Sequence, residues 1–379
     1  MKPTFSTPSP ERVKTFSCPE VNQEDKRLLF EEIQRAQAFE LTQGLLARRA
    51  EALSDRNNGL LDVLIAIAKD GIGNEEAFAF PIPQYRFIFT EADVDAVTVA
   101  ARAALHLGAL GHDMNWDAQF THPTVFVANE RYKENIVALE QNGAEIIGTD
   151  VDGKIHAFEE WEKLPHVGKI GFLTPKPKRA FERILHKKEE SASVDGKEYE
   201  SVLTDALKLI QEFAPDYHSW VTDVLRWIIP ITPPDPATGA KTRAFSMYGV
   251  PSIVHMSFPN NPLKVADLLI HECSHQYFHV AEDWFRLANG QDTNLYYSHY
   301  VKKERPIDRI LIAFHAFANV SRFYIECLRN DAPFADKAKR ELGGHEQWLS
   351  EFNEHLKVTS GLTKAGRNLW QPLADLLFR

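Results

Sequence analysis

The stretch VADLLIHECSHQYFHVAEDW, residues 265–284, has the apolar content of a buried helix but carries polar groups that such a helix rarely contains. His271, Glu272 and His275 follow the order H-E-x-x-H inside it. Its composition predicts a helix over 262–289. The two histidines are four residues apart, so they project from one face of that helix, one turn above the other.

This spacing lets two imidazoles grip one metal ion. Glu272 is rotated by about 100° from His271, which places it beside such an ion, where it can poise a water molecule. Burying these groups without partners would be costly. The alternative interpretation is a helix whose polar residues face solvent or are satisfied internally. His279 could add a ligand, although a rim or packing role suits it as well.

A second helix, predicted over 306–329, is apolar around most of its circumference and has one polar stripe. We expect His315 on this stripe to complete the metal site, with Glu326 as a rival ligand and Arg322 further along the same wall. The stripe is equally well explained as a solvent-facing surface. The longer pattern H-E-x-x-H-x-x-G-x-x-H is absent, which argues against the metzincin branch of zinc peptidases. The stripe consists of Asp308, His315, Asn319, Arg322 and Glu326.

Bulk composition narrows the class of protein. The 379 residues carry a formal net charge of −10 and no basic block, which argues against nucleic acid or an anionic membrane as partner. No apolar run reaches the roughly 18–20 residues that span a bilayer. The first twenty residues lack the apolar core of a secretion signal, so we expect a cytoplasmic protein. Three cysteines, Cys18, Cys273 and Cys327, predict no disulfide framework.

The order of predicted elements indicates an α+β protein: a mixed α/β N-terminal half, then a mostly helical metal-binding core with a small sheet. We expect two regions, 1–195, which recruits a peptide or forms a dimer surface, and 196–379, which holds the metal. Helices are predicted over 22–53, 60–70, 90–107, 199–225, 262–289, 306–329, 335–357 and 362–378. Strands are predicted at 124–130, 144–158 (a hairpin around Asp152-Gly153), 169–174, 226–232, 244–248 and 251–258.

Two segments carry a resemblance to a known family. PSIVHMSFPNNPLKVADLLIHECSHQYF (251–278) and NLYYSHYVKKERPIDRILIAFHAFANVSRFY (294–324) resemble the bacterial HExxH-motif peptide beta-hydroxylases. These are iron-using, 2-oxoglutarate-dependent proteins associated with ribosomally made, post-translationally modified peptides. The shared order is a strand, the metal helix, a YYS segment, Arg-Pro and an apolar helix with a histidine. The resemblance covers roughly residues 245–325.

The resemblance implies that His271 and His275 are iron ligands and that His315 is the third. Arg305 matches the family's arginine before proline. Where the family has a tryptophan and an arginine after the YS segment, this sequence has Tyr300 and Val301. No residue here therefore matches that arginine.

The cosubstrate imposes a further requirement. Its keto acid end chelates iron, and its far carboxylate needs a cation, for which an arginine fork is suited. Arg322 and Arg305 are the candidates, with Tyr297 or Tyr300 as hydroxyl donors. Surface or structural ion pairs explain the arginines equally well.

Three functions follow. The first is an Fe(II)/2-oxoglutarate-dependent oxygenase that hydroxylates a side-chain carbon of a peptide, with or without a leader segment, in ribosomal peptide biosynthesis. Glu272 then orients a ligand or water. The second is a zinc-dependent metallopeptidase, in which Glu272 deprotonates the attacking water. The third is a metal-stabilised binding module without catalytic activity.

Overall fold

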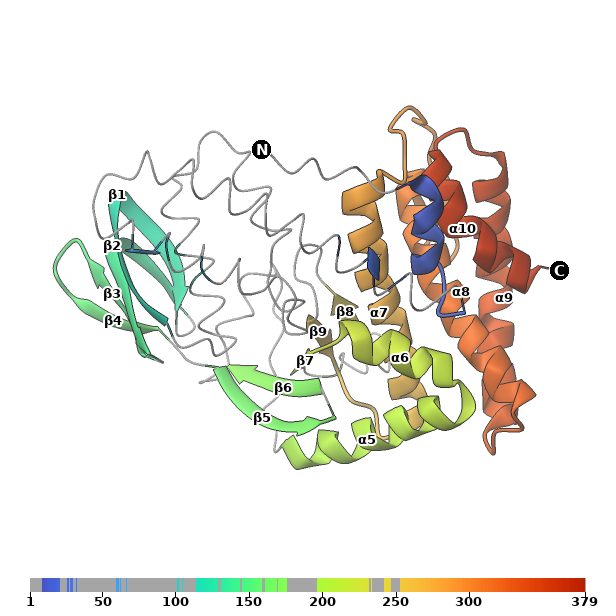
Figure 1. The fold of residues 1–379 in the computed structure, drawn as a ribbon, viewed down its shortest axis with the longest axis horizontal. Coiled ribbons are helices and arrows are strands. Elements are labelled where there is room, and N and C mark those ends of the chain that lie inside the picture. Colours follow the sequence, from blue (N-terminus) through green and yellow to red (C-terminus); the bar gives the residue numbers. More distant parts are fainter. Residues whose placement is uncertain are drawn as a thin grey trace.

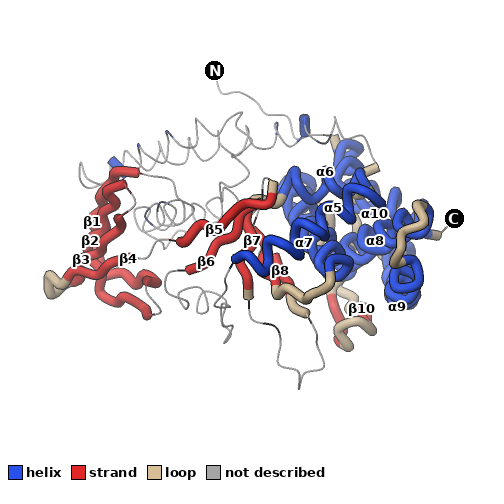
Figure 2. The backbone as a smooth tube through the Cα atoms, turned by 90° about the horizontal axis from the view of Figure 1, so that it is seen from below, coloured by secondary structure: helices blue, strands red, loops and turns tan. Residues whose placement is uncertain are grey.

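The computed structural model describes residues 9–20, 114–128, 131–143, 145–158, 161–168, 170–175, 196–231, 242–246 and 253–378, with isolated residues between them. It confirms the α+β class. Figure 1 shows the helices of the C-terminal part packed together at one end of the molecule and a separate sheet at the other. A second sheet lies between them, and Figure 2 shows its strands running up to the helices.

The central sheet has five strands in the order β5-β6-β7-β9-β8. β6, β7 and β9 are parallel, whereas the outer strands β5 and β8 pair antiparallel to their neighbours. Because β5 and β6 precede residue 195 and the others follow it, this sheet joins the two regions expected from the sequence. Its strands are Trp161–Val167 (β5), Ile170–Pro175 (β6), Trp227–Pro230 (β7), Ala244–Ser246 (β8) and Ile253–Met256 (β9).

The distal sheet is an antiparallel meander in the order β1-β2-β3-β4. The predicted hairpin around Asp152-Gly153 is confirmed: Asp150 Oδ1 accepts hydrogen bonds from the backbone N–H groups of Asp152 and Lys154. Gly153 has a φ of 76°, which a residue without Cβ adopts readily. The strands are Met114–Ala128 (β1), Arg131–Gly143 (β2), Glu145–Asp150 (β3) and Ile155–Phe158 (β4).

The helix predicted over 199–225 is in fact two helices, α5 and α6, separated at Ala214. Pro215 occupies the first turn of α6, and its ring disfavours a helical conformation at the residue before it. The helices after the sheet agree closely with the sequence patterns, because their apolar residues recur at helical spacing over long stretches. The bounds are Gly196–Phe213 (α5), Pro215–Val224 (α6), Pro262–Phe285 (α7), Ile307–Arg329 (α8), Ala335–Val358 (α9) and Lys364–Leu377 (α10).

The strands β2 and β5 were not predicted, and neither were two smaller elements, a 3-10 helix and a hairpin. The 3-10 helix η1, Pro10–Phe16, packs against α7 and α10. Its Phe16 is fully buried and lies 6.1 Å from the ring of Tyr277 on α7. The hairpin β10–β11, Tyr296–Ser298 and Lys303–Arg305, joins α7 to α8 and leans on α9.

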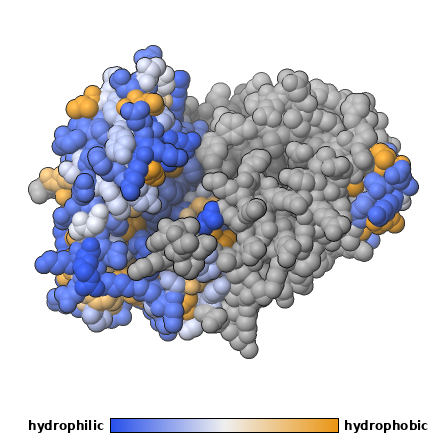
Figure 3. Space-filling view, turned by 180° about the vertical axis from the view of Figure 1, so that it is seen from behind, coloured by the Kyte–Doolittle hydropathy of each residue, from blue (hydrophilic) through white to orange (hydrophobic). Residues whose placement is uncertain are grey.

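The helices predicted over 22–53, 60–70 and 90–107 lie outside the described residues, apart from isolated positions. Within the ranges that are described, no helix combines the length and the apolar character needed to cross a membrane. All three cysteines are buried and unpaired, as the composition predicts. On the face shown in Figure 3, hydrophilic residues dominate the described helical part, with scattered apolar spots.

Candidate metal centre

The two motif histidines meet as the sequence predicts. On α7, the Nε2 atoms of His271 and His275 lie 3.1 Å apart, and their rings are nearly perpendicular, with an interplanar angle of 88°. Both rings are partly buried. The i, i+4 spacing of a regular helix is sufficient to bring these nitrogens together.

This separation suits a shared ion. Two nitrogens bound at about 2.1 Å lie about 3.0 Å apart at a right angle and about 3.4 Å apart at the tetrahedral angle. The pair therefore fits two adjacent ligand positions of one metal. His275 Nδ1 is buried and has no hydrogen-bond partner in the described part of the chain. An imidazole that binds a metal through Nε2 usually donates its Nδ1–H to a carboxylate, a backbone carbonyl or a water.

Burial keeps both imidazoles neutral near pH 7, the form that binds metal. It lowers the pKa of His271 to about 4. The pKa of His275 is also well below its usual value, because of burial and then the charges of His271, His279 and His315.

Glu272 points toward the sheet. Its Oε2 accepts a 2.9 Å hydrogen bond from Ser246 Oγ on the outer strand β8, and only 3 % of the residue is exposed. Burial raises the pKa of this carboxyl to about 7, against a smaller opposing effect of the Ser246 bond. Glu272 thus links the metal helix to a sheet edge and can exchange a proton near neutral pH.

Within the described residues His315 makes no hydrogen bond or ring contact with either motif histidine, although its charge is close enough to lower the pKa of His275. Its Nε2 donates a 2.7 Å hydrogen bond to the carbonyl of Phe16, at the end of η1. Its ring lies 5.9 Å from that of Phe278 and 6.3 Å from that of Trp220, both in the core. These contacts do not support the expectation that His315 is the third ligand; they give it a structural role.

The side of α8 that faces the histidine pair carries Phe317 instead. Its ring centroid is 5.0 Å from that of His271. Tyr300, at the tip of the β10–β11 hairpin, packs on Phe317 at 4.6 Å, and His345 of α9 lies 5.3 Å from it on another side. His345 is close enough for its charge to lower the pKa of His271. Sequence reasoning missed His345, which belongs to a helix with no other motif.

Three other predicted residues, Arg322, Arg305 and Tyr297, make no hydrogen bond or ring contact with the pair within the described residues. Arg322 donates to Glu20 at 2.8 and 3.2 Å and to Glu326 at 2.9 Å, so both the arginine fork and the rival ligand Glu326 are engaged in one ion-pair cluster. Arg305 lies on β11, and Tyr297 is 44 % exposed on β10.

His279 shows no sign of ligating with the pair. Its Nδ1 is 3.9 Å from Glu282, and its ring lies 6.4 Å from that of His275. Among the residues that the structure describes, no group of three or more histidine, cysteine, aspartate or glutamate side chains is placed to hold a metal. The pair offers two ligands, and Tyr300 and His345 both pack against Phe317 beside it. No protein-family model and no curated protein matches this chain.

Proposed function

We propose that this protein is an Fe(II)/2-oxoglutarate-dependent oxygenase that hydroxylates a side-chain carbon of a peptide, in the biosynthesis of a ribosomally made peptide. The observation that carries the proposal is the 3.1 Å contact between the Nε2 atoms of His271 and His275. It falls inside the segment, about 245–325, that resembles the HExxH-motif beta-hydroxylases. The reducing compartment suggested by three unpaired cysteines makes the cytoplasm the proposed location.

In this proposal His271 and His275 hold the iron, and the positions they leave open accept small ligands. Iron with 2-oxoglutarate supplies the oxidising power for an unactivated C–H bond. Glu272 acts as a positioning residue: its bond to Ser246 fixes the metal helix against β8.

The outer strand β8 supports a peptide as substrate. Within the described sheet it pairs only with β9, so its other edge has no described strand beside it. An extended peptide can add to such an edge through main-chain hydrogen bonds. Ser246, the last residue of β8, is bonded to Glu272, so a peptide on this edge would run past the metal helix.

One observation favours a second candidate, a zinc-dependent metallopeptidase. A general base works best when its pKa is near the working pH, and burial brings the pKa of Glu272 to about 7. A carboxylate of this kind, on the residue next to His271, has the proton affinity that activation of a hydrolytic water requires.

Metal analysis and mass spectrometry separate the two. The purified protein is analysed for bound metal, and a precursor peptide is co-expressed with it and weighed. A gain of one oxygen atom that depends on iron and 2-oxoglutarate supports the oxygenase, and a zinc-dependent loss of peptide bonds supports the peptidase. Metal binding that survives both His271→Ala and His275→Ala would overturn both.

Glu272→Gln refines the comparison, with Glu282→Gln near the end of α7 as the matched control. In a peptidase the Glu272 variant loses the base and cleavage falls by about 100-fold or more. In an oxygenase the amide still accepts the Ser246 bond, so hydroxylation persists at a reduced rate.

A further inference from the structure

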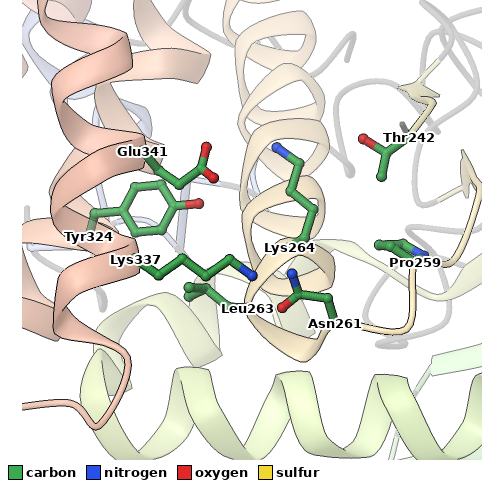
Figure 4. A pocket seen from close by; sticks show the side chains of 8 residues that line it. All are labelled: Thr242, Pro259, Asn261, Leu263, Lys264, Tyr324, Lys337 and Glu341. Atoms are coloured by element: carbon green, nitrogen blue, oxygen red, sulfur yellow. The ribbon is translucent and has the colours of Figure 1, made fainter. Parts of the chain in front are cut away.

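A cavity of about 370 Å³ opens beside the beginning of α7, between that helix and the facing pair α8 and α9. Figure 4 shows charged side chains reaching into it from both walls. Lys264 comes from α7, Lys337 and Glu341 from α9, and the hydroxyl of Tyr324 from α8. None of these residues belongs to the histidine pair, and the function proposed above uses none of them.

Part of this charge is internally paired. Lys264 Nζ donates to Asp267 Oδ2 at 2.7 Å, and Tyr324 donates its hydroxyl to the same oxygen at 2.8 Å. Asp267 is only 4 % exposed, and its Oδ2 accepts from both of these donors. The ammonium of Lys337, by contrast, has no ion pair or hydrogen bond within the described ranges, although it lines the cavity. Among the described residues that line the cavity, Lys337 therefore offers one cation without an ion pair.

The cavity and the histidine pair lie along one face of α7. Lys264, Asp267, His271 and His275 follow one another at spacings of three, four and four, which keeps them on one stripe. At 1.5 Å per residue, His271 lies about 6 Å along the axis from Asp267, to which the Lys264 ammonium is bonded. An elongated ligand of a few bonds can span from the cavity to the pair.

We infer that this cavity binds a carboxylate group of a ligand whose other end reaches His271 and His275. Lys337 supplies the unpaired charge, and Lys264, whose charge Asp267 balances, can donate a further hydrogen bond from its ammonium. These lysines, and not Arg322, bind the carboxylate, because the Arg322 guanidinium already donates to Glu20 and Glu326. Glu341, the acidic residue in the lining, opposes the anion and limits its affinity.

The inference rests on the proposed function for the source of the carboxylate, which is either 2-oxoglutarate or the C-terminus of the substrate peptide. Both present the same group to the same lysines, and binding experiments distinguish them. Protein treated with a chelator is titrated calorimetrically at low ionic strength, so that neither iron nor turnover is needed. The probes are 2-oxoglutarate, a tripeptide with a free C-terminus and the same tripeptide as its C-terminal amide.

Two lining variants should act in opposite directions. Lys337→Ala should weaken carboxylate binding by about tenfold or more, the loss typical of a charge-assisted hydrogen bond. Glu341→Gln should strengthen it by about threefold, because a like charge several ångströms away is removed. The controls are Lys339→Ala and Glu346→Gln, which change exposed residues of the same helix and should leave affinity within about twofold.

A loss of 2-oxoglutarate binding in Lys337→Ala assigns the cavity to the cosubstrate. A loss confined to the free-acid peptide, with the amide unaffected, assigns it to the peptide terminus. If no probe binds, or if the two lining variants match their controls, the inference is overturned. Hydroxylation in an otherwise normal Lys337→Ala variant, with unchanged affinity for both 2-oxoglutarate and the free-acid tripeptide, would overturn the inference about the cavity and leave the proposed function standing.

Discussion

Acidification should destabilise this protein through its buried histidines, and His255 on β9 allows the effect to be worked out. This residue is 1 % exposed, and its ring stacks on Phe245 of β8, with centroids 4.5 Å apart and planes within 7°. Burial lowers its pKa to about 3, whereas an unfolded chain gives histidine a pKa of about 6.5. Between these values the unfolded chain binds one more proton than the folded one, so the free energy of unfolding falls as the pH falls.

From pH 7 to pH 5 this one residue accounts for a loss of about 2 kcal/mol in the free energy of unfolding. The loss would continue down to about pH 3, where the folded protein also takes up the proton. His255→Gln removes the titrating group. The variant is less stable than the wild type at pH 7, where packing on Phe245 is lost, but acid should cost it about 2 kcal/mol less by pH 5.

Urea denaturation at pH 7, 6 and 5, followed by tryptophan fluorescence, measures both curves. Phe245→Leu is the matched control: it disturbs the same stack and leaves the imidazole in place, so its curve should stay parallel to that of the wild type. His271, His275, His315 and His345 also have lowered pKa values from burial, but they are present in both proteins and cancel in the difference. Parallel curves for His255→Gln and wild type would refute the reasoning.

Four further substitutions test other parts of the structure. Gly366→Ala should destabilise the protein by about 2 kcal/mol or more, because the added Cβ would lie 2.2 Å from the carbonyl oxygen of Leu287. Gly343→Ala, in the interior of α9, adds a Cβ with no atom within 4 Å, so it should stabilise the protein by up to about 1 kcal/mol. Urea denaturation measures both changes in the free energy of unfolding. Asn319→Ala should lower the free energy of unfolding by about 2–4 kcal/mol, since it leaves several buried hydrogen-bond partners unsatisfied. Amide hydrogen exchange at residues 10–20 should become faster, because Asn319 anchors the end of η1. Unchanged exchange there would contradict this anchoring. Phe317→His should place a third imidazole against the histidine pair and tighten zinc binding by about tenfold or more in a competition titration, whereas an unchanged affinity would show that α8 does not face the ion.

The elements that depend on local pattern could be predicted from the sequence. The helix predicted over 262–289 is observed over Pro262–Phe285, and it ends where Arg286 adopts a left-handed conformation with a φ of 46°. The HExxH spacing brings the two histidines together because the helix itself sets their geometry. The break between α5 and α6 was also readable, since a proline at 215 disfavours a helical residue before it.

Contacts between distant parts of the chain could not be predicted. His315 was expected at the metal, and nothing near it in sequence reveals that its partner is a carbonyl 299 residues earlier. Asn319 and Arg322, from the same stripe, likewise bind Ser17 and Glu20. A polar stripe on an apolar helix indicates that polar partners exist, but it does not say whether they are an ion, water or another segment of the same chain.

The contacts of this polar stripe determine which side of α8 faces the histidine pair on α7. Residues 315 and 317 are about 200° apart around a helix, so α8 cannot turn both toward α7's histidine pair. Because η1 holds the polar stripe through His315, the apolar side bearing Phe317 is the one left to face the pair. Tyr300 and His345 flank Phe317 from the hairpin and from α9, so under the proposed function we look to these two elements for any third protein ligand.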